Sequence, residues 1–503
     1  MSRVPTLRTT ARRTILLSMV TALIAAAVLG AFAPSTAAAP PLIAPYFGPN
    51  VQVDRAPAYT GSTPALAVGS DGVVYLAFNG FGGATTQNDI FFTKSTDGKT
   101  WTVPLRVNND AGGANQAEPA IAIDASMPSP HILISWTDAR NAGNNDVFFA
   151  KSSDGGLSFS ANVRVNDVTT NSQSEPDLAV DHANPDLIHV IWTDTRNAGT
   201  GADIYYANST DGGLSFNPSQ RVNNDGAAGV EQSQPSIRVG PNRDVYAIWT
   251  DPRTAAAGRD IYFAKSADRG ATWNPNIRVN DDPVVNVVQQ DPTIAVNATG
   301  TIYAAWTDSR NGNTGSDIYA ARSTNAGSSF TSNVRVNDDV TPAGQSTPSL
   351  GIAANSVELA WTDTRNAGST SWDIFAASSS DGLSWSPNVR VNDDPLGAFQ
   401  VLPSVGVDAS RDVFVAWLDT RGPSGDVYAS VLDRVAPTAR AGSSATVDQG
   451  TPVSFDGSTS SDNLGVASYA WDFGDGTSGA GATATHTYQD AGVYTATLTV
   501  WDG

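Results

Sequence analysis

The stretch that decides the fold is residues 235–280, PSIRVGPNRDVYAIWTDPRTAAAGRDIYFAKSADRGATWNPNIRVN, which contains one copy of a repeat. Four short runs rich in Val, Ile, Tyr, Phe and Trp alternate with turn residues. They predict strands over residues 235–239, 245–250, 260–265 and 276–280. No run shows a 3.6-residue apolar period, so the copy needs no helix. Four antiparallel strands repeated along a chain are typical of a β-propeller.

The repeat recurs about every 57 residues, and its copies can be counted strand by strand. A fixed period of this length indicates one supersecondary unit copied several times. Three of the four strands occur seven times, whereas the fourth occurs six times. The first strands begin at Pro64, Pro119, Pro176, Pro235, Pro292, Pro348 and Pro403. The second strands hold Phe78, Trp136, Trp192, Trp249, Trp306, Trp361 and Trp417. The fourth strands end at Arg106, Arg164, Arg221, Arg278, Arg335 and Arg390.

The missing fourth strand stands near the start of the chain. Residues 50–54, NVQVD, align with residues 388–392, NVRVN. If this segment pairs with the seventh copy, the ring has no open edge. The sequence therefore predicts an all-β fold in which residues 40–435 form a seven-bladed β-propeller whose N-terminal strand closes the last blade.

The composition limits the classes of function. The chain has 503 residues and a net charge of -20, which disfavours nucleic acid and anionic membrane surfaces as partners. The absence of cysteine excludes disulfides and thiolate chemistry, and the four histidines show no metal-ligand spacing. Asn-Asp-Asp turns after the fourth strands offer oxygen ligands that calcium favours, but their spacing matches no calcium-binding loop and turn capping is the favoured role. We predict no metal site and no cofactor.

Residues 1–39 are predicted to be a signal peptide. A basic start precedes an apolar run over residues 15–33, and small residues follow at 35–39. Arg12 and Arg13 loosely fit a twin-arginine export signal. An uncleaved membrane anchor is the alternative. We expect a secreted or cell-surface protein of a prokaryote, exported by the Sec or twin-arginine route, with no membrane span once the signal is removed.

The sharpest motif lies between the third and fourth strands, and its copy at residues 152–159 is SSDGGLSF. In such a hairpin the aspartate accepts backbone N–H bonds, glycine takes a positive φ and the aromatic residue plugs the blade core. The motif resembles the Asp-box, or BNR repeat, of sialidase-like propellers, over roughly residues 50–433. In that family the Asp-box is structural and lies on the face opposite the active site. The residues that carry this role over are Asp97, Asp154, Asp211, Asp268, Asn325 and Asp381.

The resemblance also raises sialidase activity. Sialidases have six blades, an arginine triad for the substrate carboxylate, a Tyr-Glu nucleophile pair and an Asp acid/base. This chain has seven near-identical copies and lacks the family's Phe-Arg-Ile-Pro motif. Arg55 replaces an Asp that other copies carry at this position, and it is either a remnant of the triad or an ordinary loop change. The candidate catalytic residues are Arg55, Glu118, Glu175 and Glu231.

Six arginines follow the second strands and are expected on the face opposite the Asp-boxes. Sialidases bind substrate on that face, so it is the candidate ligand-binding face here. Each arginine follows an aspartate by two residues, and a repeated Asp–Arg tie is the favoured alternative to ligand binding. The arginines are Arg140, Arg196, Arg253, Arg310, Arg365 and Arg421.

Residues 436–503 differ in composition and contain no Asp-box. The runs WDFGDG at 471–476 and HTY at 486–488 resemble the PKD domain, an Ig-like β-sandwich. The family normally continues into one more strand after Trp501, so either the chain is a fragment or this edge is completed otherwise. The resemblance implies a spacer or adhesion module on the cell surface.

These features predict an exported cell-surface propeller that binds glycans or cell-envelope proteins. An exo-sialidase-type glycoside hydrolase is the first alternative, and a structural surface-layer component is the second. The sequence favours binding over catalysis because an active site needs groups in different environments, which near-identical blades do not offer.

Overall fold

The computed structural model of the chain describes residues 8–11, 47–54, 59–82, 87–110, 113–124, 129–141, 143–197, 201–226, 230–253, 258–283, 287–311, 315–354, 356–366, 371–394, 397–422 and 425–502. Arg55 and most of the predicted signal peptide lie outside these residues. The chain forms two compact units: Pro49–Leu432, and Asp433–Gly503 together with N-terminal residues up to Gly48. The described part contains no helix of the length and apolarity that a membrane span requires.

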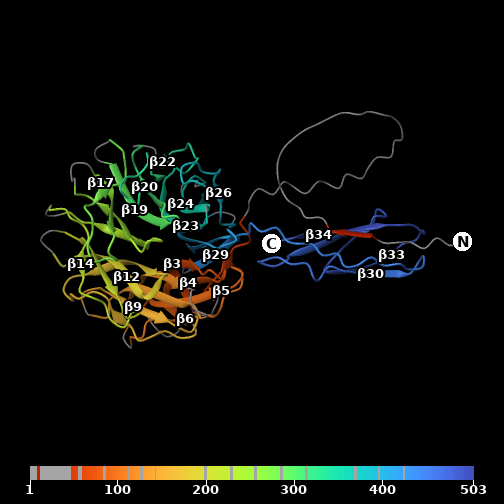
Figure 1. Cartoon of the computed structure of the whole chain (residues 1–503), viewed down its shortest axis with the longest axis horizontal. Coiled ribbons are helices and arrows are strands. Elements are labelled where there is room, and N and C mark those ends of the chain that lie inside the picture. The colour runs from red at the N-terminus through yellow and green to blue at the C-terminus, as the bar shows by residue number, and fades with distance from the viewer. Residues whose placement is uncertain are drawn as a thin grey trace. The chain divides into compact units, whose positions relative to one another are not determined.

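The larger unit consists of seven four-stranded antiparallel blades arranged as a ring (Figure 1). Blade 1 comprises β3 (Tyr59–Val68), β4 (Val74–Gly82), β5 (Asp89–Ser95) and β6 (Leu105–Arg106). Blade 2 comprises β7 (Gln116–Asp124), β8 (His131–Asp138), β9 (Asp146–Ser152) and β10 (Val163–Arg164). Blade 3 comprises β11 (Gln173–Asp181), β12 (Asn184–Asp194), β13 (Asp203–Ser209) and β14 (Gln220–Arg221). Blade 4 comprises β15 (Ser233–Val239), β16 (Val245–Asp251), β17 (Gly258–Ser266) and β18 (Ile277–Arg278).

The remaining three blades repeat this order. Blade 5 comprises β19 (Val287–Val296), β20 (Ile302–Asp308), β21 (Asp317–Ser323) and β22 (Val334–Arg335). Blade 6 comprises β23 (Gln345–Ala353), β24 (Ser356–Asp363), β25 (Asp373–Ser379) and β26 (Val389–Arg390). Blade 7 comprises β27 (Gln400–Val407), β28 (Val413–Asp419), β29 (Asp426–Leu432) and the N-terminal β2 (Val51–Gln52).

The ring closes as the sequence predicts. Strand β2 pairs antiparallel with β29, with Val51 opposite Ala429 and Gln52 opposite Tyr428. The first strand of each blade contacts that of the next, and β27 contacts β3, which completes the circle. A short parallel pairing of Gly258 with Val287 also joins blades 4 and 5 into one sheet. The prediction of a seven-bladed propeller closed by its N-terminal strand is confirmed.

The hydrophobic core lies between the blades. Every residue of β16 is buried, because a second strand has a neighbour on each side and another blade against each face. The repeated tryptophans of the second strands are fully buried, and the indole Nε1 of each donates to an aspartate two residues later at 2.8–3.0 Å. The aspartate of the Trp-Thr-Asp motif therefore satisfies a buried donor that would otherwise have no partner.

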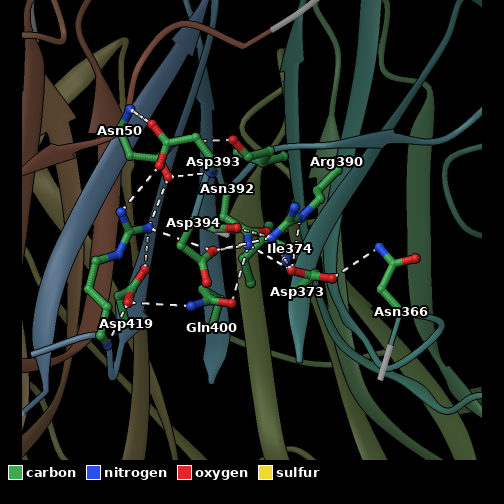
Figure 2. A network of polar contacts seen from close by, with 12 residues as sticks. Asn50, Asn366, Asp373, Ile374, Arg390, Asn392, Asp393, Asp394, Gln400 and Asp419 are labelled. Atoms are coloured by element: carbon green, nitrogen blue, oxygen red, sulfur yellow. Dashed lines mark hydrogen bonds and ion pairs between the residues drawn. The ribbon is translucent and has the colours of Figure 1, made fainter. Parts of the chain in front are cut away.

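A polar cluster recurs where one blade meets the next. Figure 2 shows the cluster between blades 6 and 7. At the junction of blades 6 and 7, Asn392 Nδ2 donates to Asp373 Oδ1 at 2.7 Å, Asp394 Oδ1 at 2.6 Å and Gln400 Oε1 at 3.2 Å. Its Oδ1 accepts from the Ile374 N–H at 2.8 Å. One amide thus satisfies groups of two blades, which explains why Asn, Asp and Gln recur at these positions.

The Asp-boxes clamp neighbouring blades together. Asp154 Oδ1 accepts from the Leu157 and Ser158 N–H groups at 2.9 and 3.0 Å, and hydrogen bonding lowers the pKa of this carboxyl. The ring of Phe159 packs edge-on against Phe92 of blade 1, with centroids 5.3 Å apart. Phe159 also packs against the hydrophobic cluster that residues of blades 1 and 2 form. The contact lies between blades, because the box turns toward the preceding blade.

The smaller unit is a β-structure with its own core. Strands β31 (Ser468–Asp472), β32 (Ser478–Ala480) and β34 (Thr495–Trp501) form one sheet, in which β1 (Arg8–Ala11) pairs parallel with β34. Strands β30 (Pro452–Asp456) and β33 (Thr483–Thr487) form the other sheet. Trp471 is buried between them with Phe455, and its Nε1 donates to the Gly481 carbonyl at 3.1 Å. Trp471 is therefore a core residue of this unit.

Candidate functional site

The first strand of every blade carries one residue with a positive φ, immediately before its proline. The seven φ values lie between 26° and 56°. Each residue interrupts the strand pairing as a bulge. The first strands contact one another around the ring, so the bulges form a circle at its centre. Non-glycine residues in this region are strained and concentrate at functional sites. The seven residues are Thr63, Glu118, Glu175, Gln234, Asp291, Thr347 and Leu402.

Side chains of four successive blades connect this circle. Glu118 Oε2 accepts from Thr137 Oγ1 at 2.8 Å and from the Glu175 N–H of the next blade at 2.8 Å. Glu175 Oε2 accepts in the same way from Thr193 Oγ1 and the Gln234 N–H, both at 2.8 Å. In each case one carboxylate oxygen satisfies a hydroxyl of its own blade and a backbone N–H of the neighbour.

Gln234 and Asp291 continue the series. Gln234 Oε1 accepts from Thr250 Oγ1 at 2.9 Å and from the Asp291 N–H at 3.1 Å, and its Nε2 donates to Asp291 Oδ1. Farther around the ring, threonines of blades 5 and 6 accept from the next blade: Thr307 Oγ1 accepts from the Thr347 N–H, and Thr362 Oγ1 accepts from the Leu402 N–H. We call Glu118, Glu175, Gln234 and Asp291 the acidic arc.

Burial makes the arc electrostatically unusual. Burial raises the pKa of the Glu175 carboxyl, against hydrogen bonds from Gln234 and Thr193 that lower it, and the charges of Glu118 and Asp291 raise it further. Burial likewise raises the pKa of Asp291. Among the described residues, Oε1 of Glu118 and Oε1 of Glu175 accept no hydrogen bond. These two oxygens can accept from a ligand's hydroxyl groups.

The predicted catalytic candidates fall into three groups. Glu118 and Glu175 are brought together in the arc. Glu231 is exposed and lies two residues before β15, outside the arc. Arg55 lies outside the described residues. Gln234 and Asp291 were missed, although one rule finds all four members, since each is the residue before the proline that begins a predicted first strand.

The six arginines of the candidate ligand-binding face are engaged within the protein. Arg310 donates to Asp308 at 2.7 Å and to Asp281 at 2.9 Å, and its guanidinium lies 4.1 Å from the centre of the Tyr319 ring. All six guanidinium groups stack on a third-strand aromatic ring in this way. This arrangement is the Asp–Arg tie that the sequence offered as the alternative. A role of these arginines in ligand binding stays a prediction.

A second cluster of carboxylates lies in the smaller unit. Asp433, Asp462 and Asp502 each offer an oxygen, and these oxygens lie within 4.8 Å of one another. Sequence reasoning missed this cluster because its members are far apart in the chain and belong to no spaced motif. The donors are all oxygen, which suits a hard cation. The sequence prediction of no metal site stays a prediction.

Comparison with known proteins defines the two units. Residues 434–503 match the family described as PKD domain. This part of the chain is a PKD domain. Among solved structures, a polysaccharide lyase of family PL25, an ulvan lyase, is similar over 75% of this chain and 95% of its own, with 12% identity and a TM-score of 0.51. An α-L-arabinanase of Penicillium chrysogenum is similar over 77% of this chain and 99% of its own, with 13% identity and a TM-score of 0.45. A Hadza microbial sialidase is similar over 75% of this chain and 66% of its own, with 12% identity and a TM-score of 0.40. The propeller therefore shares its fold with the ulvan lyase, and at 12% identity the likeness concerns the fold alone.

Proposed function

We propose that the protein is exported to the cell surface and that its propeller binds a neutral glycan at the acidic arc, with the PKD domain as a spacer or adhesion module. The arc carries the proposal. Within the described part of the chain, Glu118 and Glu175 of adjacent blades each have one carboxylate oxygen that accepts no hydrogen bond, and bonds between the blades fix their backbone. Rigid acceptors of this kind suit the hydroxyl groups of a sugar.

The charge of the face favours a neutral ligand over an acidic one. The chain has a net charge of -20, and Glu118, Glu175 and Asp291 concentrate negative charge near the axis. The guanidinium groups of Arg310 and its equivalents form ion pairs with aspartates of the propeller itself. A sialoside or uronate would therefore meet carboxylates where it needs guanidinium groups. A protein of the cell envelope is the other class of partner that this face would suit.

Binding to an array of neutral oligosaccharides of hexose, pentose and N-acetylhexosamine units tests the proposal, with sialylated oligosaccharides on the same array. Glu118→Gln and Glu175→Gln should each weaken binding of the best neutral oligosaccharide at least tenfold by calorimetry. Glu231→Gln is the matched control, because it removes the same charge from an exposed site outside the arc. An array on which only sialylated oligosaccharides bind, or none does, contradicts the proposal.

A glycoside hydrolase is the second candidate, and the raised pKa of Glu175 beside Glu118 favours it. A carboxyl group with a raised pKa that lies beside a second carboxyl group is typical of the general acid of glycoside hydrolysis. In this case aryl glycosides of neutral sugars should be cleaved, and Glu175→Gln should abolish turnover while leaving binding measurable. Sialidase activity would instead appear as hydrolysis of a fluorogenic sialoside that Arg55→Ala abolishes. A protein that neither binds nor cleaves a glycan would be left with the structural surface-layer role.

A further inference from the structure

Two large aromatic side chains stand exposed where blade 6 meets blade 7. Trp372 is 42% exposed and Phe399 is 40% exposed. Their ring centroids are 5.5 Å apart, and the rings are nearly perpendicular at 81°. We call this pair the aromatic platform.

The platform lies on the same face as the acidic arc. Trp372 immediately precedes β25, whose first residue pairs with the last residue of β24. Phe399 immediately precedes β27, whose first residue pairs with the last residue of β28. The arc residues also lie near the starts of first strands, whereas the Asp-boxes follow the ends of third strands. The platform and the arc are therefore both opposite the Asp-boxes.

The platform is a departure from the repeat. The same two positions at the other blade junctions carry polar, charged or smaller residues, so the scaffold does not require aromatic rings there. An exposed Trp at such a position leaves apolar surface in contact with water and contributes nothing to the core. The equivalent pairs are Asn88 with Asn115, Asn145 with Ser172, Ala202 with Glu231, Arg259 with Val288, Ser316 with Gly344 and, where the ring closes, Gly425 with Thr60.

The backbone beneath the platform is fixed. The Gln400 N–H donates to the Trp372 carbonyl at 3.0 Å. The Phe399 N–H donates to Thr420 Oγ1 at 2.7 Å, and the Thr420 N–H donates to the Phe399 carbonyl at 2.9 Å. A ligand that binds here does not have to order the main chain, which lowers the entropic cost of binding.

We propose that the aromatic platform is a subsite that stacks against the apolar face of one neutral sugar ring. This inference rests on the proposed function. The C–H groups of a sugar ring carry partial positive charge, which the π-face of an indole or phenyl ring attracts. The acidic arc and the net charge disfavour an acidic sugar.

The size of the platform also selects the occupant. A stable protein interface covers roughly 800 Å² on each partner and about 20–30 residues, whereas two isolated rings offer the footprint of one sugar unit. Leu402 is the bulge residue in the first strand of blade 7, and it is apolar where the equivalent Glu118 and Glu175 are acidic. The face therefore has an acidic part on blades 2–5 and an apolar part on blades 6 and 7. An oligosaccharide that reaches both would place hydroxyl groups at the first and a ring face at the second.

The test uses the full chain and the neutral oligosaccharide that binds best on the array described above. Trp372→Ala and Phe399→Ala should each weaken its binding at least tenfold by calorimetry. Trp372→Phe should retain binding within about threefold, because it keeps an aromatic face. Leu214→Ala is the control, since Leu214 is 78% exposed and belongs to an Asp-box on the opposite face. Thermal unfolding should be the same for all four variants.

The outcomes separate this inference from the function on which it rests. Binding that Glu175→Gln weakens and Trp372→Ala leaves unchanged overturns the subsite while the proposed function stands. If the wild type binds no neutral oligosaccharide, both are overturned. If Trp372→Ala instead converts a wild-type dimer into a monomer in sedimentation experiments, with sugar affinity unchanged, the platform contacts a second copy of the chain and the sugar subsite is overturned.

Discussion

Replacing Asp54 by Asn should stabilise the propeller at neutral pH and leave it unchanged in acid. At six blade junctions an asparagine Nδ2 donates to the aspartate that begins the third strand, at 2.6–2.8 Å. At the seventh junction, where the ring closes, the equivalent residue is Asp54, and it faces Asp426. Asp54 Oδ2 accepts from the Val427 N–H at 3.2 Å, whereas the buried Oδ1 has no hydrogen-bond partner among the residues that the structure describes. The ring therefore closes on two carboxyl groups where every other junction has an amide and a carboxylate.

The size of the effect follows from the pKa of Asp54. Burial, with a further contribution from the charge of Asp426, raises it from 3.8 to about 6. Because the folded-state pKa is above the unfolded value, the stability associated with the protonated group is complete below pH 3.8 and is lost as the pH rises through 6. At about 1.4 kcal/mol per unit, the loss approaches roughly 3 kcal/mol by pH 8. Asp54→Asn removes the titrating group and restores an amide donor toward Asp426.

Urea unfolding followed by tryptophan fluorescence at several pH values between 4 and 8 measures this difference, because the blade tryptophans are buried. The advantage of Asp54→Asn over the wild type should be near zero at pH 4 and grow to roughly 3 kcal/mol at pH 8. Asn392→Asp is the reciprocal variant, since it places the same acidic pair at an intact junction and should lose stability over the same pH range. If the curves of Asp54→Asn and the wild type run parallel from pH 4 to 8, the two carboxyl groups do not determine the stability of the closing junction.

Three further changes test the scaffold. Gly270→Ala should destabilise the propeller strongly in urea unfolding, because φ is +90° and a Cβ would collide with the Tyr206 ring. Gly143→Ala is the control: its φ is +100° but no atom lies within 4 Å of the added Cβ, so it should show only the smaller cost of the backbone conformation. Equal effects of the two variants would contradict the clamp between blades. Arg310→Lys should cost about 1–3 kcal/mol, because the single nitrogen of lysine cannot replace both Nη1, which donates to Asp281, and Nη2, which donates to Asp308 and Asn333. Full stability of this variant would contradict the tie between blades. Asp154→Ala should cost about 1 kcal/mol in thermal or urea unfolding and leave glycan binding unchanged, since the Asp-box lies opposite the proposed binding face. A selective loss of binding would reverse the assignment of the faces.

The repeat made the scaffold predictable, but two of the four residues of the acidic arc could not be recognised from the sequence. Strand order, blade number and ring closure follow from turn chemistry and a constant period, and residues 50–54 could be matched to a missing strand by eye. The six arginines stood out because they recur with the same period, and in the structure they bind aspartates of the propeller itself. Gln234 and Asp291 do not stand out as Glu118 does, because side-chain type varies around the circle. What they share is a backbone bulge before a proline, which only the folded ring brings to the axis. Trp372 and Phe399 lie 27 residues apart and meet only because adjacent blades do.

The arc itself contains the comparison that separates scaffold from function. Gln234 accepts from its threonine and from the next blade's N–H with a single amide oxygen, as Glu118 and Glu175 do with a single carboxylate oxygen. The scaffold therefore needs an acceptor at these positions and not a charge. Burial makes that charge unfavourable at Glu175, whose pKa is raised. Glu175→Gln should consequently preserve or raise the stability of the propeller at pH 7 while it weakens ligand binding. Loss of stability in this variant would mean that the carboxylate serves the ring, and the arc would then be a structural feature without a ligand.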